Sequence, residues 1–198
     1  MKHRLSTIIL AAAASVFALS ACDTSVATAA TPAPAPFSTT VQAAYDSIAG
    51  QTTGFTLGAP LAAKVAYVFF DPQCPHCAHL WNAAQPLGAS ARIVWIPIGM
   101  LSRASAPQGA TILGAADPAK AMTENETSIL NRQGGLTADS DAVARFKDKV
   151  AANTALFNSM RAKDDGVPFI VTKVNGEVRS QSGSLSTPQL KQFLGLPN

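Results

Sequence analysis

The sequence predicts an α/β domain over residues 60–198, because segments with the patterns of strands and of helices alternate along it. Residues 64–70 (KVAYVFF) form a dense apolar run, which is typical of a central strand buried on both faces. Cys74 and Cys77 follow with C-x-x-C spacing, where a helix is predicted to begin. The end of such a strand is where open α/β sheets place their chemistry.

The remaining elements are predicted in the order strand, helical insert, hairpin and helix. Pro118 after Asp117 is typical of a helix start with the aspartate as N-cap. Asn175-Gly176, between two runs of strand-forming residues, is the strongest short signal for a hairpin. The predicted segments are a helix from Cys74 to about Gln85, a strand at 91–98, a helical insert at about 105–160, a hairpin at 167–181 and a terminal helix at 186–195 capped by Ser186 or Thr187.

Residues 1–21 have the composition of a bacterial secretory signal. Basic residues precede an apolar run at 8–18, which is short for an anchor because a spanning helix needs about 20 apolar residues. LSAC, ending at Cys22, resembles the lipobox of bacterial lipoproteins, and Asp23 resembles the signal that keeps lipoproteins at the inner membrane. We therefore expect a periplasmic protein with a lipid on Cys22. The alternative is cleavage near 27–29, which would discard Cys22 and leave a soluble protein.

Removal of the signal leaves a nearly neutral chain. The whole sequence has 15 basic and 12 acidic side chains, and without Lys2 and Arg4 the balance is 13 to 12. This balance argues against a nucleic-acid partner. The remaining chain of about 175 residues is long enough for one domain with its own core.

Two segments precede the predicted domain. Residues 22–37 are rich in Ala, Pro and Thr, and their alternating prolines favour extended polyproline II, so we expect a tether. Residues 38–59 are predicted to be a short N-terminal helical segment, because apolar side chains recur at helical spacing between Val41 and Ile48, before Gly50.

The cysteine pair has three interpretations. A zinc site would need Cys74, Cys77, His76 and His79 together, and four ligands so close at one helix start cannot all converge. A structural disulfide at this spacing would close almost no loop and stabilise little. A C-x-x-C pair beside a strand–helix pattern indicates a thioredoxin-like redox motif, which we favour. This interpretation predicts a redox-active Cys74–Cys77 disulfide, no metal and no cofactor.

The residue types at the pair suit this chemistry. We expect Cys74 to be an exposed, acidic nucleophile, because unpaired N–H groups at a helix N-terminus favour the thiolate. Pro75 fits the first helical position, where its missing donor costs nothing. His76 adds a positive or hydrogen-bonding group that lowers the thiol pKa further. Cys77, one turn later and more buried, is expected to be the resolving thiol.

The chain resembles the catalytic domain of the periplasmic Dsb thiol–disulfide proteins, in particular the DsbG and DsbC branch. The resemblance covers about residues 60–198 and implies a thioredoxin-like fold with a helical insertion between the second strand and a cis-proline hairpin. It implies that Pro168 is cis and faces the cysteines, and that Val167, with Pro75, contacts an extended substrate. The motifs that carry it are YVFFDPQCPHCAHLW (67–81), DPAKAM (117–122), GVPFIV (166–171) and LKQFLGLPN (190–198).

The chain also departs from these relatives. Residues 37–60 are too short for their N-terminal dimerisation domain, so we expect a monomer that reshuffles disulfides poorly. Val167 stands where DsbG and DsbC typically have threonine. Val68 stands where thioredoxin and DsbA bury an acidic residue.

Several nearby residues are expected to have structural roles. Asp71 is predicted to be a strand-end cap rather than a proton relay. His79 is predicted to be solvated, and Trp81 to lie in the core or a cleft wall. Asn125 begins an N-x-T pattern for glycosylation, which the bacterial signal makes a chance match.

The predicted function is an envelope thiol:disulfide oxidoreductase that acts on cysteines of exported proteins and is recharged by an unidentified membrane redox partner. One alternative is a reductase of sulfenic acids or of a single dedicated substrate. Another is a non-catalytic, chaperone-like module that binds peptides beside Pro168. The intact cysteine pair argues against the last alternative, since a chaperone does not need it.

Overall fold

A computed structural model describes residues 41–197. The predicted signal peptide at 1–21, Cys22 and the tether at 22–37 lie outside the described residues and stay predictions. Over residues 41–197, no helix is both long enough and apolar enough to cross a membrane.

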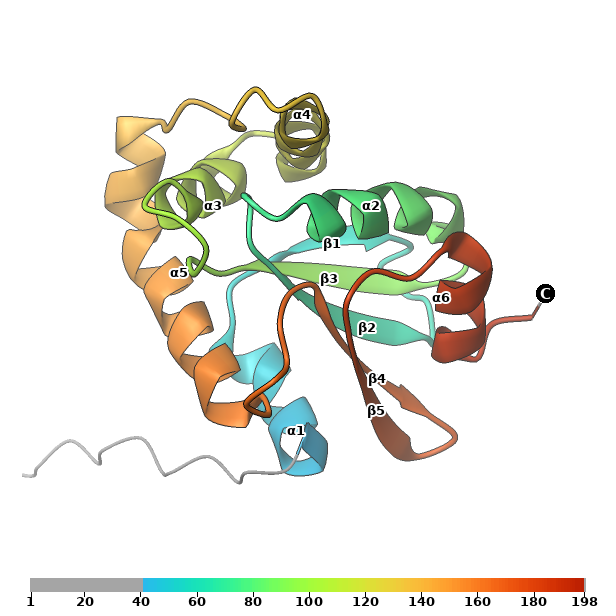
Figure 1. Ribbon diagram of the computed structural model, residues 1–198. Helices are drawn as coiled ribbons and strands as arrows, with labels where there is room; N and C mark the ends of the chain where they lie inside the picture. The colour runs from blue at the N-terminus through green and yellow to red at the C-terminus, as the bar shows by residue number, and fades with distance from the viewer. Residues whose placement is uncertain (1–40, 198) are drawn as a thin grey trace, which may run out of the picture. The chain divides into compact units, whose positions relative to one another are not determined.

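The described part of the chain forms six α-helices and five strands, labelled in Figure 1. The strands are β1 (Phe55–Gly58), β2 (Val65–Phe70), β3 (Arg92–Pro97), β4 (Phe169–Val174) and β5 (Glu177–Ser182). The helices are α1 (Val41–Gln51), α2 (Pro75–Ala84), α3 (Ser105–Gly114), α4 (Pro118–Leu130), α5 (Ser140–Met160) and α6 (Thr187–Leu194), and a short 3₁₀ turn, Gln85–Leu87, follows α2.

The strands form one mixed sheet in the spatial order β1-β3-β2-β4-β5. β2 is central: it pairs in parallel with β3 and antiparallel with β4. β1 and β5 are the edges, and each pairs antiparallel with its neighbour. A parallel pair needs a crossover connection, which α2 supplies between β2 and β3 (Figure 1). This arrangement places the start of α2 at the carboxyl end of the central strand.

The central strand contributes to a core on each face of the sheet. Ala66, Val68 and Phe70 pack into the core shared with α2 and α6. Tyr67 and Phe69 pack into the core shared with α1 and α5. Successive side chains of a strand point to opposite faces, so a strand between two cores must be apolar throughout. The predicted burial of this strand on both faces is confirmed.

α3, α4 and α5 are the helical insert predicted at 105–160. α5 packs on α3 and on α1, whereas α4 packs on α2. As predicted, Asp117 caps α4, where its side chain accepts a hydrogen bond from the backbone N–H of Lys120, and Pro118 takes the first helical position. The insert therefore lies beside the helix that carries the cysteine pair (Figure 1).

Residues 55–58, predicted to belong to a helical segment at 38–59, form the edge strand β1 instead. Phe55 lies opposite Trp95 in the antiparallel ladder, and its ring packs edge-on against Trp81 with 6.0 Å between centroids. β1 has four residues, of which only Phe55 is buried, so its sequence carries almost no strand pattern. Pairing with β3 and aromatic packing create this strand, and the helix itself ends earlier, at Gln51.

The hairpin and the terminal helix follow their predicted chemistry. Asn175 and Gly176 both have positive φ, 52° and 87°, as a two-residue turn matched to the twist of its strands requires. Ser186 caps α6 in a capping box with Gln189.

Candidate active site

Cys74 is the N-cap residue of α2, with extended backbone angles, and Pro75 occupies the first helical position. The N–H of Cys74 donates to the Asp71 carbonyl at 2.9 Å, which closes the turn after β2. The carbonyl of Cys74 accepts the first helical hydrogen bonds, from the N–H groups of Cys77 and Ala78. The sulfur of Cys74 therefore lies at the end of the helix that presents unpaired N–H groups.

The surroundings of Cys74 lower the pKa of its thiol from 9.0 to about 7. The largest cause is the hydrogen bond that the Cys77 thiol donates to the Cys74 sulfur, and the backbone N–H groups of Cys77 and His76 add to it. Burial and the negative charge of Asp71 act in the opposite direction. At neutral pH a large fraction of Cys74 is thus thiolate, the nucleophilic form.

Cys77 has the opposite character. It is fully buried in the core shared with α2 and α6, and burial is the largest cause that raises its pKa well above 9.0. Its hydrogen bond to Cys74 and the negative charges of Cys74 and Glu126 raise this pKa further. Both cysteines are free thiols in the structure. The pair therefore consists of an acidic sulfur and, one helical turn further along the chain, a sulfur that keeps its proton.

The Val167–Pro168 peptide bond is cis, and the backbone of Val167 lies at the sulfur of Cys74. The carbonyl of Val167 lies 3.5 Å from the sulfur of Cys74 and accepts its hydrogen bond. Pro168 is buried and directly precedes β4, and the side chain of Val167 packs against both cores. A segment 93 residues away in sequence thus covers the nucleophile.

Cys74 is predicted to be exposed, and this is wrong: only 4% of the residue is accessible. The cover comes from Val167, as described above. A molecule that reacts with this sulfur must therefore approach along the Val167–Pro168 segment or displace part of it, because the sulfur does not project into solvent.

Asp71 is fully buried and ties the cysteine turn to the loop after β3. One carboxylate oxygen accepts from the N–H of Gln73 at 2.9 Å, and the other accepts from the N–H groups of Met100 and Leu101 at 2.7 and 2.9 Å. This confirms the predicted capping role. Met100 and Leu101 have exposed apolar side chains, so the carboxylate holds an apolar loop at the rim of the site.

Gln73 and Gln108 anchor a second loop, the connection between α4 and α5. The Gln73 side chain donates to Gln108 at 2.6 Å and to the carbonyl of Gly134 at 2.8 Å. Gln108 is buried and donates to the carbonyls of Gly134 and Leu136. Because Gln73 directly precedes Cys74, this network fixes the insert against the cysteine turn.

Glu126 is an ionisable group close to the site that reasoning from the sequence missed. It lies on the buried face of α4 with 1% of its surface accessible, and burial is the largest cause that raises its pKa to about 9. The negative charges of Cys74 and Asp71 raise this pKa further, whereas a hydrogen bond from Asn125 lowers it. Met122, Glu126 and Ile129 are spaced as one helical stripe, which is the pattern that could have revealed this burial.

The remaining residues of α2 near the cysteine pair fall into two groups. Pro75, His76 and His79 are exposed on α2, so the contribution of His76 to the thiol comes from its backbone N–H and not from its ring. Trp81 is buried in the core, where its ring packs against Trp95 with 5.0 Å between centroids.

Asn125 is buried, and its side chain donates to the Pro72 carbonyl and accepts from the N–H of Leu136. The asparagine of the glycosylation pattern therefore has a structural role. Its hydrogen bonds join α4 to the turn before the cysteines and to the α4–α5 loop.

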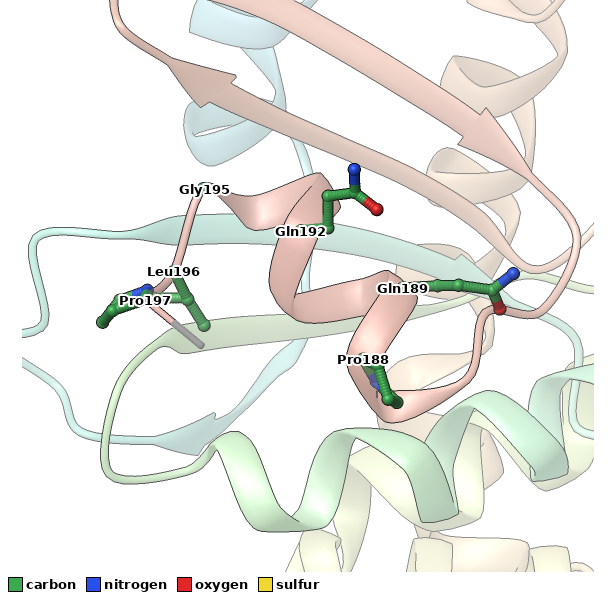
Figure 2. Close-up of a pocket in the computed structure, with 6 residues that line it drawn as sticks. All are labelled: Pro188, Gln189, Gln192, Gly195, Leu196 and Pro197. Carbon is green, nitrogen blue, oxygen red and sulfur yellow. The ribbon is translucent and has the colours of Figure 1, made fainter.

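The hollow shown in Figure 2 lies at the other end of α2 from the cysteines. It has a volume of about 820 Å³ and lies along α6. The Thr187 hydroxyl donates to the Ala83 carbonyl at 2.8 Å, which places α6 against the last turn of α2, about 15 Å along the helix from Cys74. Its lining contains no ionisable or thiol side chain and consists of Pro188, Gln189, Gln192, Gly195, Leu196 and Pro197.

Comparison with known sequences gives matches to DsbG proteins, while no protein-family model matches the chain. The chain is 28% identical over 136 residues to the thiol:disulfide interchange protein DsbG of Pseudomonas aeruginosa, a match that covers 68% of this chain and 52% of that protein. It is 35% identical over 69 residues to DsbG of Escherichia coli, covering 34% and 28% of the two chains. The chain thus spans about half the length of the first relative.

Comparison with solved structures shows the thioredoxin-like fold. The thiol-disulfide exchange protein alpha-DsbA2 of Wolbachia pipientis superposes with a TM-score of 0.59 at 16% identity, covering 78% of this chain and 94% of that one. The catalytic domain of ScsC from Proteus mirabilis gives a TM-score of 0.56 at 17% identity, covering 78% and 96%. At these identities the likeness establishes the fold alone, and it agrees with the fold predicted from the sequence.

Proposed function

We propose that this DsbG-like chain is an envelope thiol:disulfide oxidoreductase, which exchanges disulfides with cysteines of exported proteins through Cys74 and Cys77. One observation carries the proposal. Two sulfurs in hydrogen-bond contact have pKa values shifted in opposite directions, to about 7 for Cys74 and well above 9.0 for Cys77. A dithiol needs this asymmetry so that one sulfur attacks and leaves while the other stays protonated until it is needed.

In the oxidising direction, a substrate thiolate attacks the Cys74 sulfur of the Cys74–Cys77 disulfide. The S–S bond breaks, its electron pair leaves with the Cys77 sulfur, and a mixed disulfide forms between substrate and Cys74. A second substrate thiolate then attacks the substrate sulfur of this mixed disulfide. The Cys74 thiolate leaves, and its low pKa makes it a good leaving group. The substrate is oxidised by two electrons and the pair is reduced to the dithiol.

In the reducing direction the same steps run backwards. The Cys74 thiolate attacks a substrate disulfide, and the Cys77 sulfur resolves the mixed disulfide by attacking Cys74. A sulfenic acid on a substrate cysteine can take the place of the disulfide, in which case water leaves. The membrane redox partner that oxidises or reduces the pair decides which direction prevails.

The surface around the sulfurs supports an extended protein segment as substrate. The backbone of Val167 lies at the sulfur of Cys74, where it can pair with a strand-like segment once the substrate replaces the thiol as its partner. Pro75 is exposed beside it, and Met100 and Leu101 supply exposed apolar side chains, 38% and 54% accessible, at the same rim. Backbone pairing with few side-chain requirements suits a broad set of unfolded exported proteins.

The proposed location is the periplasm, with a lipid on Cys22 that holds the domain at the inner membrane through the tether at 22–37. This part of the proposal depends on the LSACD sequence and on the DsbG relatives. Labelling cells with a palmitate analogue should mark the wild type and not Cys22→Ala. Absence of label, with a mature N-terminus near Ala30, would contradict the lipid and leave a soluble protein.

Trapping of reaction intermediates tests the activity. Cys77→Ser should accumulate mixed disulfides with exported proteins, because the resolving thiol is missing, and Cys74→Ser, its matched control, should accumulate none. Rapid alkylation of wild-type cells then gives the direction: a mostly oxidised pair indicates a disulfide donor, and a mostly reduced pair indicates a reductase or isomerase. If neither variant forms mixed disulfides while both bind unfolded peptides, the chain is a peptide-binding module and the proposal fails.

A further inference from the structure

Glu126 is buried in the helical insert without the partners that a buried carboxylate needs. Its Oε1 accepts one long hydrogen bond, 3.4 Å, from the side-chain amide of Asn125. Its Oε2 has no hydrogen-bond partner among residues 41–197. Glu124, two residues earlier on the same helix, is exposed and pairs with Lys120 at 3.7 Å. An ionised carboxylate is costly in a buried, unpaired position, so Glu126 is stable there only with a proton.

The helix that carries Glu126 is fixed against the cysteine turn. α4 packs on α2 (Figure 1), and the Trp81 indole N–H of α2 donates to the Thr123 hydroxyl of α4 at 3.2 Å. Asn125 donates to the carbonyl of Pro72, two residues before Cys74, at 2.8 Å. The adjacent side chain, Glu126, is close enough to both sulfurs for its charge to interact with theirs.

The proton affinities of the two buried groups decide the direction of transfer between them. The pKa of Glu126 is raised to about 9, chiefly by burial, so it is protonated at neutral pH. Burial raises the pKa of Cys77 well above 9.0, so a thiolate formed there is a stronger base than the Glu126 carboxylate. These directions favour transfer of a proton from Glu126 to a newly formed Cys77 thiolate.

We propose that the Glu126 carboxyl is the proton store of the Cys77 sulfur: it gives up its proton when the Cys74–Cys77 bond opens and takes it back when the bond closes. This inference rests on the proposed thiol–disulfide exchange. When a substrate thiolate breaks the bond, the electron pair goes to the Cys77 sulfur, which receives the proton of Glu126 and becomes a thiol. Solvent then reprotonates the carboxylate. In the reducing direction, Glu126 first releases its proton to solvent, and the carboxylate then removes the Cys77 proton as that sulfur attacks Cys74.

The ionisable groups around Glu126 are few. α2 carries Cys77 and two exposed histidines, His76 and His79, and the turn before α2 carries Asp71 and Cys74. α3 and β1, which also pack on α4, contain no ionisable side chain. The negative charges of Cys74 and Asp71 both oppose ionisation of Glu126. Conversion of the Cys74 thiolate into a mixed disulfide removes one of these two negative charges. This lowers the pKa of Glu126 and favours the carboxylate form, which can accept the proton of Cys77.

The test follows the two thiols separately. The reduced full-length protein, with Cys22→Ala so that only the pair reacts, is mixed with a coloured aromatic disulfide. The first aromatic thiol is released when the mixed disulfide forms on Cys74, and the second when Cys77 resolves it. Glu126→Gln is compared with Glu124→Gln, a matched change on the exposed face of the same helix. Circular dichroism establishes that both variants are folded.

Glu126→Gln should slow the second release about tenfold or more at pH 7, within the range of general acid–base effects, and leave the first release nearly unchanged. The wild-type rate of the second release should rise with pH and level off at or below pH 9, where Glu126 is ionised. In Glu126→Gln the rate should rise beyond that pH, because hydroxide must then remove the Cys77 proton. Glu124→Gln should follow the wild type.

Two other outcomes would overturn the inference. A second release slowed by the same factor at every pH would mean that Glu126 only shapes the site, and an unchanged rate would mean that it has no part in the reaction.

An infrared measurement on the wild type is independent of folding in the variant. A protonated-carboxyl band that disappears as the pH rises through about 9 is expected, and its absence at neutral pH would contradict the proton store. If the wild type releases no aromatic thiol at all, the proposed function fails as well.

Discussion

Cys74 at the N-cap of α2 and Glu126 in the middle of α4 are both buried ionisable side chains, and their pKa values shift in opposite directions. Cys74 is 4% accessible and its pKa falls to about 7, whereas Glu126 is 1% accessible and its pKa rises to about 9. Burial raises the pKa of both groups. The difference lies in the donors. Cys74 has the Cys77 thiol and two N–H groups of a helix start, and a residue in the middle of a helix has no free N–H groups nearby.

This comparison explains why the fold can hold a charge at one buried position and a proton at another. Cys77 supplies a thiol donor one turn along the same helix, and the helix N-terminus adds backbone donors, so residues close in sequence stabilise the Cys74 thiolate. α4 passes the same region with its backbone groups already paired. A carboxyl placed there stays neutral.

The neutral state of Glu126 should appear as a dependence of stability on pH. Its pKa is 4.5 in the unfolded chain and about 9 in the folded one, so the folded state holds the extra proton between these values. Stability from this group is therefore complete below pH 4.5 and falls as the pH rises through about 9. Between pH 5 and 8 the loss should approach about 4 kcal/mol, since each pH unit contributes about 1.4 kcal/mol.

Urea unfolding of Glu126→Gln, compared with Glu124→Gln at several pH values, measures this effect. The free energy of unfolding of Glu126→Gln should gain on that of the wild type as the pH rises, and Glu124→Gln should follow the wild type. A constant difference between Glu126→Gln and the wild type would mean that Glu126 is ionised in the folded protein at neutral pH, and the contrast with Cys74 would be lost.

Removal of the Cys77 thiol donor should raise the pKa of Cys74, so that burial dominates there as it does at Glu126. In Cys77→Ala the largest cause of the lowered pKa is gone while burial remains, so the pKa of Cys74 should rise from about 7 toward 9.0. Cys77→Ser retains a hydroxyl donor and should keep the pKa low. Titration of thiolate absorbance measures both. Equal pKa values in the two variants would show that the backbone N–H groups alone stabilise the thiolate.

Asp71 acts on both buried acids, so its neutralisation should move them together. Its charge raises the pKa of Cys74 and of Glu126, and Asp71→Asn should lower both. The same change replaces the Asp71 oxygen that accepts from the N–H groups of Met100 and Leu101 by an amide nitrogen, which donates and cannot accept. We expect a loss of about 2 kcal/mol in the free energy of unfolding.

Asp46→Asn is the matched control, because Asp46 is exposed in a surface pair with Lys173 at 3.5 Å and should contribute almost nothing. If Asp71→Asn were as stable as Asp46→Asn, the carboxylate would not hold the loop after β3.

The sequence predicts the features whose signals are local. The two-faced strand at 65–70, the cysteine turn and the Asn175-Gly176 hairpin depend on residues that are neighbours in the chain, and the structure has all three. β1 could not be found, because its four residues become a strand only through pairing with β3. The exposure expected for Cys74 was wrong for a similar reason: its cover, Val167, lies 93 residues away.

The location of Glu126 near the two sulfurs could not be predicted from the sequence either. Its position on a stripe with Met122 and Ile129 indicates burial, but a helical stripe does not say which other element will cover it. Only the packing of α4 on α2 places the carboxyl near the sulfurs. The chemistry of a residue could thus be predicted where its neighbours in sequence are its partners in space, and not elsewhere.

Val167 contacts the acidic sulfur from a segment outside the helix, and its replacement should have a small effect. Its carbonyl accepts from Cys74 at 3.5 Å, and its half-buried side chain packs at the junction of the two cores. Threonine has nearly the same shape as valine and adds a hydroxyl donor, so Val167→Thr should leave folding almost unchanged. The donor can bond the Cys74 sulfur or a bound substrate, and it should shift the redox potential of the pair by tens of millivolts. About 30 mV corresponds to about 1.4 kcal/mol for a two-electron couple, which one altered hydrogen bond can supply.

Equilibration against glutathione gives the potential, and decay of a trapped mixed disulfide gives its lifetime. Val178→Thr, the same change at another half-buried position beside the core shared with α1 and α5, should alter neither quantity. If Val167→Thr also leaves both at their wild-type values, the side chain of Val167 does not reach the reacting sulfur, and the stabilisation of the thiolate belongs to the helix start and Cys77 alone.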